Sequence, residues 1–272
     1  MEGQVIQELL AAAPIFLLTA VRAFAMIETA PLLSSEAIPR VAKFGLAGFA
    51  AYAGFPSSLL NTSAPIIQAF GLSFVFLIIG EALIGVIIGF FITIIFAAFT
   101  TAGQFFSLQM GFGASEAYDP LSQVENPLMG QYLNLVAMLV FLSLGGFREL
   151  FLGGFWRSIQ SLNVLALIEG REGVITMLLS GLTRLFRDAL VISMPILGTL
   201  FLTSLSTGLI SKAAPQVNLL SEGFPISITV AFILIFATMP FMIEAFARII
   251  DGGFWAIQDL YARIGTQIGA AL

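Results

Sequence analysis

The sequence LSFVFLIIGEALIGVIIGFFITIIFAA, residues Leu72–Ala98, decides the fold class of this chain. It contains 27 residues and only one charge, Glu81. As a helix it would be about 40 Å long, more than the roughly 30 Å hydrocarbon core of a bilayer. Its many aliphatic and aromatic side chains favour the membrane, and together they outweigh the few kcal/mol that one acid costs there. The segment is therefore predicted to be a membrane helix.

The composition of the whole chain extends this prediction to the rest of the protein. Of its 272 residues, 58% are hydrophobic and 10% are charged. Soluble domains carry about 25% charged residues, so this chain has too few charges to cover a soluble globule. We therefore expect an all-α integral membrane protein.

Neither cysteine nor histidine occurs in the chain. Their absence removes thiolate nucleophiles, imidazole bases and the usual ligands of zinc and haem. The net charge of −5 argues against nucleic acid as a ligand, because a basic stripe would be expected. We expect no catalytic residues, no bound cofactor and no metal. The N-terminal sequence MEGQVIQE lacks the basic region of a signal peptide, so the first apolar segment is expected to be retained.

Hydropathy divides the chain into six apolar segments of unequal length: Leu9–Ile27, Phe44–Phe55, Leu72–Ala98, Tyr132–Leu144, Ala189–Ile210 and Phe224–Phe246. Phe44–Phe55 would give only about 18 Å of helix, too little to cross a bilayer. No Lys or Arg occurs between Lys43 and Arg148, so three crossings in that interval would split the basic groups between two compartments. We therefore predict helical hairpins with irregular or incomplete crossings, and Phe44–Phe55 as the segment that does not cross.

Glu81 begins a series of small residues at every fourth position of its segment, which continues through Gly85, Gly89, Thr93, Ala97 and Thr101. Small residues at this spacing share one helix face and allow a second helix to approach closely. Glu81 is therefore predicted to face another helix and to make an inter-helix or inter-subunit ionic contact. A purely structural hydrogen bond and an ion relay are the alternatives.

Arg22 lies inside the first apolar segment. Charges within the membrane usually pair and face protein or a cavity. Glu28 is six residues away, nearly opposite on a helix, and is not an obvious partner. Two alternatives stay open for Arg22: an ion pair with Glu81, or extension of the side chain to the membrane interface. We assign Arg22 to helix packing or to a subunit interface.

Glycine and proline punctuate the stretch TAGQFFSLQMGFGASEAYDPLSQVENP, Thr101–Pro127, which we expect to be a long loop. Connections longer than about 12–15 residues are uncommon unless they are functional or disordered, and the apolar side chains here favour burial. Lipid cannot satisfy an irregular backbone, so such a loop must lie in protein or line a cavity. We predict a gate or plug, and an ordinary extramembrane loop is the alternative. The residues assigned to the plug are Phe105, Phe106, Leu108, Gln109, Met110, Gly111, Phe112 and Gly113.

Two stretches have the pattern of amphipathic helices. Arg148–Leu162 places Leu150, Phe155 and Ile159 on one face, and apolar residues recur at spacings of three and four over Ile250–Ile268. Each is predicted to lie at a membrane interface or against a partner helix, or equally to pack inside this chain.

The sequence GLISKAAPQVNLLSEGFP, Gly208–Pro225, is predicted to be a structured turn between two helices. Pro215 prevents simple continuation of the first helix. The turn carries one cation and one acid but no catalytic grouping. Its residues assigned to helix packing or a subunit interface are Lys212, Pro215, Gln216, Asn218, Gly223 and Pro225, and Gly85 and Gly89 share this assignment.

A set of short motifs, in their order and spacing, resembles the FliR family, the export-gate membrane subunit of the bacterial flagellar type III secretion apparatus, which is related to SctT of injectisomes. The motifs are Ala30-Pro31, Gly45-Leu46-Ala47, Ile84-Gly85, Leu108-Gln109-Met110-Gly111, Asp119-Pro120, Ala214-Pro215-Gln216 and Gly223-Phe224-Pro225. The chain departs from the family pattern at Gln104, where Glu is usual, and at Ser221-Glu222, where an apolar pair is usual.

The resemblance implies a FliP-like helical portion at residues 1–188 and a FliQ-like portion with an amphipathic C-terminal helix at residues 189–272. It implies FliP-like and FliQ-like membrane subunits, FlhB-like and FlhA-like components, unfolded export substrates and membrane lipids as partners, in the inner membrane at the flagellar basal body. Residues 104–123, the plug segment, would close the central passage.

The sequence thus predicts a non-enzymatic subunit of the flagellar protein export gate, which forms and plugs the passage for unfolded substrates. An injectisome export-gate subunit is the alternative. A secondary transporter would need matching interrupted segments in two halves of the chain, which are not seen. An intramembrane protease would need a Ser/Lys or Asp/Asp pair at membrane depth, and none stands out.

Overall fold

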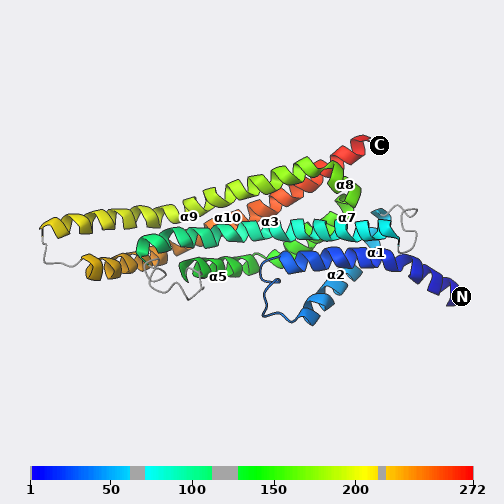
Figure 1. The fold of residues 1–272 in the computed structure, drawn as a ribbon, viewed down its shortest axis with the longest axis horizontal. Helices are drawn as coiled ribbons and strands as arrows, with labels where there is room; N and C mark the ends of the chain where they lie inside the picture. Colours follow the sequence, from blue (N-terminus) through cyan, green and yellow to red (C-terminus); the bar gives the residue numbers. More distant parts are fainter. Residues whose placement is uncertain (1, 62–70, 112–127, 214–218, 272) are drawn as a thin grey trace. The chain divides into compact units, whose positions relative to one another are not determined.

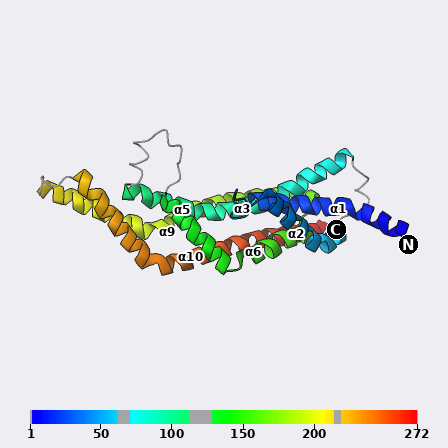
Figure 2. The ribbon, with the colours of Figure 1, turned by 90° about the horizontal axis from the view of Figure 1, so that it is seen from below.

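The computed structural model describes residues 2–61, 71–111, 128–213 and 219–271, and these ranges are built from helices without strands (Figures 1 and 2). The elements are α1 (Glu2–Thr29), α2 (Arg40–Asn61), α3 (Leu72–Met110), α5 (Leu128–Ser143), α6 (Gly146–Arg148), the π-helix η2 (Glu149–Trp156), α7 (Arg157–Ser161), α8 (Val164–Glu169), α9 (Arg171–Ala213) and α10 (Leu219–Ala271). The prediction of an all-α protein is confirmed.

Within the described ranges, four helices are long and apolar enough to cross a membrane: α1, α3, α9 and α10. A fifth candidate is a bent one, because α5 and the run Gly146–Ser161 meet at an angle of 75°. The chain is therefore an integral membrane protein. Helix α2, which contains Phe44–Phe55, is not in this group, and its failure to cross the bilayer stays a prediction.

The chain forms two compact units, each assembled from separate stretches of sequence. Unit 1 contains Met1–Ile94, Gly145–Gly181 and Asp251–Leu272, and unit 2 contains Ile95–Leu144 and Leu182–Ile250. The division into portions at residues 1–188 and 189–272 rests on the family resemblance and stays a prediction.

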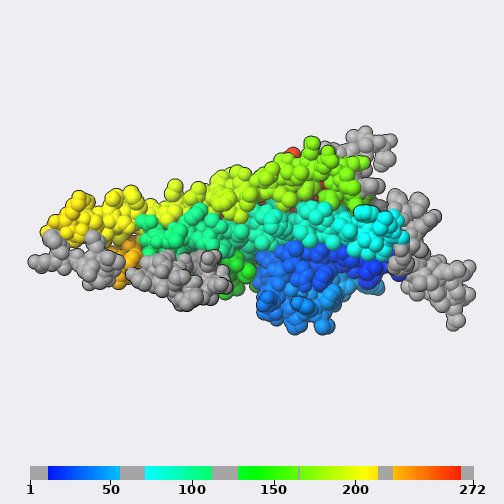
Figure 3. Space-filling view, viewed as in Figure 1, coloured from blue at the N-terminus to red at the C-terminus, as the bar shows by residue number. Residues whose placement is uncertain are grey.

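Unit 1 is organised around α1 and the first half of α3, which run side by side in Figure 1. Helix α1 contributes three fully buried residues, Ala23, Met26 and Ile27. Helix α3 contributes Ile84 and Ile92, each 1% exposed. Helix α2 packs on α1, and Figure 3 shows the two (blue) against each other on one face of this unit.

The two amphipathic stretches pack inside the chain. Four of the apolar residues over Arg148–Leu162 are buried: Leu150, Phe155, Ile159 and Leu162. The C-terminal stripe is buried from Ile250 to Ile264, while the side chain of Ile268 lies outside the described residues. Part of the first stretch is a π-helix, η2, which the apolar pattern did not predict. It contains Gly153 and Gly154, and a Cβ on Gly154 would come within 3.3 Å of Ile88.

Unit 2 is held by aromatic side chains from the second half of α3 and its neighbours. The rings of Phe99 and Phe246 lie 4.5 Å apart, and Phe96 meets Phe141 edge to face at 5.5 Å. Such pairs add to the stabilisation that burial itself provides. Gly103 lies against α5, where a Cβ would come within 2.5 Å of the Gly130 backbone. The helices are therefore close enough here that only glycine fits.

The structure corrects the prediction that Thr101 begins a loop, because α3 continues to Met110. Ala102, Phe106 and Met110 recur every four residues and are fully buried, so the helix has a continuous apolar face up to its end. Gly103, taken as a loop signal, instead permits close helix packing. Residues 112–127 lie outside the described residues.

The structure also corrects the boundaries of the predicted turn over Gly208–Pro225. Helix α9 continues to Ala213, and α10 begins at Leu219, so Gly223 and Pro225 are helical. Proline is more frequent in membrane helices than in soluble ones, and α10 also contains Pro240. The glycine and proline signals therefore predicted a turn that is too long at both ends.

Candidate functional site

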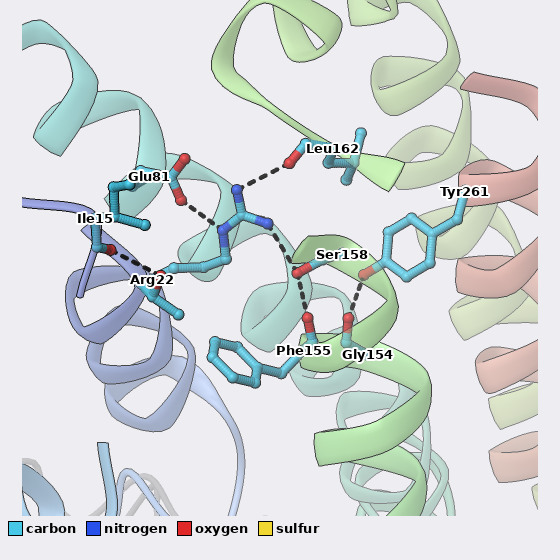
Figure 4. Close-up of polar contacts among 9 residues, drawn as sticks. Ile15, Arg22, Glu81, Gly154, Phe155, Ser158, Leu162 and Tyr261 are labelled. Atoms are coloured by element: carbon cyan, nitrogen blue, oxygen red, sulfur yellow. Dashed lines mark hydrogen bonds and ion pairs between the residues drawn. The ribbon is translucent and has the colours of Figure 1, made fainter. Parts of the chain in front are cut away.

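The clearest polar site in unit 1 is a buried ionic cluster, which we define as Arg22, Glu81, Ser158 and the carbonyl of Leu162 (Figure 4). The Arg22 side chain is only 4% exposed. Its Nε donates to Glu81 Oε2 at 2.6 Å, Nη1 donates to Ser158 Oγ at 3.1 Å, and Nη2 donates to the Leu162 carbonyl at 2.9 Å. All three guanidinium nitrogens thus have acceptors, as a cation inside the membrane requires.

Each acceptor in the ionic cluster is available for a local structural reason. Leu162 directly follows α7 and has an extended backbone, so its carbonyl points away from the helix hydrogen bonds, and a helix C-terminus favours a nearby cation. Ser158 donates its hydroxyl proton to the Phe155 carbonyl at 2.6 Å, which leaves a lone pair for Arg22. Arg22 therefore joins α1, α3 and the end of α7 through one side chain.

A second polar contact ties α10 to the π-helix. The Tyr261 hydroxyl donates to the Gly154 carbonyl at 2.9 Å, and both groups are buried (Figure 4). A π-helix changes the backbone hydrogen-bond register, and such segments are frequent at functional sites. Tyr261 and Ser158 thus donate to the two consecutive backbone carbonyls of Gly154 and Phe155.

The pair of Arg22 with Glu81 is one of the two alternatives that the sequence left open. Extension of Arg22 to the membrane interface is not what the structure contains, because the side chain points into the protein. The sequence did not identify Ser158, Leu162 or Tyr261 as members of this region. Their partners are more than 100 positions away, and no local spacing signals such a contact.

The small-residue face of α3 packs on α1, as its spacing predicted. A Cβ on Gly85 would overlap the Arg22 carbonyl and come within 3.0 Å of the Met26 nitrogen. A Cβ on Gly89 would overlap the Thr29 hydroxyl and approach the Met26 carbonyl at 2.7 Å. The contact is therefore between helices of this chain, and it brings Glu81 beside Arg22.

A second ion pair in unit 1 joins the end of α1 to α2. Lys43 Nζ donates to Glu28 Oε2 and to the Ser34 carbonyl, each at 3.1 Å, and the Lys43 side chain is only 6% exposed. Glu28, rejected as a partner of Arg22, is thus the partner of another buried cation. The sequence did not predict this pair.

The described part of the plug segment is the last two turns of α3 and Gly111. Phe106 and Met110 are fully buried and Phe105 is half-buried, whereas Leu108 is 66% exposed and Gln109 is exposed. Gly111 ends the helix with φ +90°, and its N–H donates to the Leu108 carbonyl at 3.1 Å. Phe112 and Gly113 lie outside the described residues.

The residues predicted to pack near the α9–α10 connection are only partly described. Lys212 is exposed in the last turn of α9, and Gly223 has open space where a Cβ would be. Pro215, Gln216 and Asn218 lie outside the described residues. In the part of the chain that the structure describes, no group of three or more acidic side chains is placed to hold a metal ion.

Comparison with known proteins agrees with this architecture. Residues 13–253 match the family described as "Bacterial export proteins, family 1". The flagellar biosynthetic protein FliR of Escherichia coli is 31% identical over 80% of this chain and 82% of its own length. The FliR of Bacillus subtilis is 29% identical over 93% of this chain and 97% of its own. The surface presentation of antigens protein SpaR of Shigella flexneri is 29% identical over 59% of this chain and 61% of its own. A family match over most of its length, together with these relatives, shows that the chain belongs to the bacterial export proteins of family 1, within the FliR family.

Proposed function

We propose that this protein is a non-enzymatic subunit of the flagellar type III export gate in the bacterial inner membrane, where it helps to form and plug the passage for unfolded export substrates. Membership of the FliR family makes it a membrane component of the flagellar export apparatus. The plugging role is the part that we add, and it concerns the plug segment at residues 104–123.

The observation that carries the proposal is the length and end of α3. This helix has 39 residues, about 58 Å, nearly twice the thickness of a hydrocarbon core. Its last buried residue, Met110, is followed at once by Gly111 in the left-handed region, which redirects the chain. A long helix anchored by a buried apolar face would hold the start of the plug segment at a fixed position.

The exposed surface of α2 supports the proposed partners. Val41, Phe44, Phe49 and Tyr52 are each 60–82% exposed, although α2 is not among the helices apolar enough to span a membrane. Exposed apolar surface of this kind marks a protein or membrane interaction site. We propose FliP-like and FliQ-like membrane subunits as the neighbours, together with FlhB-like and FlhA-like components.

Assembly and export test the proposal together. The tagged chain, expressed in a flagellated bacterium whose own FliR gene has been deleted, should restore swimming. The detergent-extracted complex should give an intact mass that requires additional small membrane proteins. A chain that extracts as a single polypeptide and binds a small solute would instead support a transporter.

The SpaR relative motivates a second candidate, an injectisome export-gate subunit. The FliR relatives align over more of this chain, which favours the flagellar assignment. Complementation separates the two candidates, since rescue of an injectisome secretion defect without rescue of swimming would reverse the assignment.

A further inference from the structure

We infer that Phe224 of α10 is a positioning residue for the gate: its ring fixes the place at which the chain leaves α3 at Gly111. The contact lies within unit 2, which contains both residues. The functional consequence rests on the proposed plugging role, whereas the contact itself does not.

The geometry at Gly111 admits no side chain. A Cβ built there would overlap Cδ1 and Cε1 of Phe224 and lie 3.2 Å from its Cγ. The backbone at φ +90° independently favours glycine, because L-residues rarely adopt that region. The Phe224 ring therefore lies directly against the backbone at the point where α3 ends.

Other glycines show that this close approach is not a general property of turns or of α10. Gly145 also has a positive φ, +70°, yet nothing lies within 4 Å of a Cβ built on it. Gly223, next to Phe224, likewise faces open space. The contact thus needs both the turn at Gly111 and the ring at position 224.

The helical turn that precedes Gly111 is also held in place. Phe106 and Met110 are fully buried, so the last turn of α3 cannot move away from the ring without exposing them. Gly111 is therefore held by the buried end of α3 that precedes it and by the Phe224 ring, and loss of the ring should release it.

Resting ion leakage of the assembled gate tests this inference. The chain is expressed with its gate partners in cells, and sodium uptake is measured without substrate. Phe224→Ala should raise uptake by more than half of the increase caused by deleting residues 114–121, whereas Phe224→Leu, which keeps an apolar group, should raise it less. The matched control is Phe232→Ala on the same helix, because Phe232 is also an exposed aromatic residue at 48% exposure.

Two results separate failure of this inference from failure of the proposed function. If the deletion leaks and Phe224→Ala does not, the inference is overturned and the plugging role stands. If the deletion does not leak either, the plugging role is wrong and the functional consequence falls with it.

The absence of cysteine permits an independent test of the contact, which also decides the matter if Phe224→Ala assembles poorly. The pair Gly111→Cys and Phe224→Cys should form a disulfide under mild oxidation in the membrane-embedded complex. The control, Gly111→Cys with Phe232→Cys, also carries Phe224→Ala, so that the ring which would overlap a Cβ at position 111 is absent from both proteins. This control should not cross-link, because eight residues along a helix displace the second thiol by about 12 Å. Equal cross-linking of both pairs, or of neither, would overturn the inference.

Discussion

Removal of Glu81 should destabilise unit 1 strongly, because it leaves the Arg22 guanidinium buried without its counter-ion. Breaking a buried ion pair from one side typically costs about 3–5 kcal/mol. Two features place this site near the lower value: the Glu81 side chain is 13% exposed, and Arg22 keeps its bonds to Ser158 and Leu162. We therefore expect Glu81→Leu to lower the free energy of unfolding by about 3 kcal/mol.

The double variant Arg22→Met/Glu81→Leu distinguishes loss of a counter-ion from loss of packing. Replacing a buried ion pair by apolar side chains is often neutral or stabilising. Here the Leu162 carbonyl loses its donor, which offsets part of the gain. The double variant should therefore recover at least half of the stability that Glu81→Leu loses.

Tryptophan fluorescence during denaturant unfolding in detergent suits this measurement. The two tryptophans, Trp156 and Trp255, both belong to unit 1, which contains the ionic cluster. The control is Asp259→Asn, since the Arg263–Asp259 pair is exposed at both side chains and surface pairs are worth about 0–1 kcal/mol. If Glu81→Leu costs no more than Asp259→Asn, or if the double variant is less stable than Glu81→Leu, our reasoning about the cluster is wrong.

Three further variants test other contacts in unit 1. Gly89→Ala should disrupt the α1–α3 contact and cost about 1–3 kcal/mol by overpacking, whereas Gly48→Ala, with open space at its Cβ, should change the same unfolding curve little. Tyr261→Phe should cost about 0.5–1.5 kcal/mol, the net contribution of one hydrogen bond, because the Gly154 carbonyl keeps the backbone N–H of Arg157 as a donor; equal stability of this variant and the parent protein would argue against the contact. Lys43→Met leaves the Glu28 carboxylate without its partner, but that side chain is 37% exposed and can be solvated, so the variant should lower the thermal midpoint less than Glu81→Leu does. The reverse order would contradict the burial that we describe.

The sequence predicted contacts best where one helix face carried the whole signal. The spacing of Glu81, Gly85 and Gly89 predicted close approach of a second helix, and the structure places α1 there. The spacing of the C-terminal apolar stripe predicted an amphipathic helix, and the structure selects packing inside this chain from the alternatives that the spacing left open. In both cases the required information lies within a few turns of one helix.

The sequence failed where a residue has two physical uses. Gly103 was taken as a loop signal, because glycine ends helices and also allows two helices to pack closely. Phe105 was assigned to the same loop. Only the partner surface at Gly130, absent from the local pattern, decides between these uses. The partners of Arg22 at Ser158 and Leu162, and the partner of Tyr261 in the π-helix, are likewise set by distant segments, so they could not be predicted from spacing.

The conductance of the reconstituted gate is the most direct measurement of the central claim, that this chain helps to close a passage through the membrane. The complete complex should be almost non-conducting in a planar bilayer without substrate, and the complex with residues 114–121 deleted should carry a steady ion current. Equal conductance of the two complexes would contradict the claim.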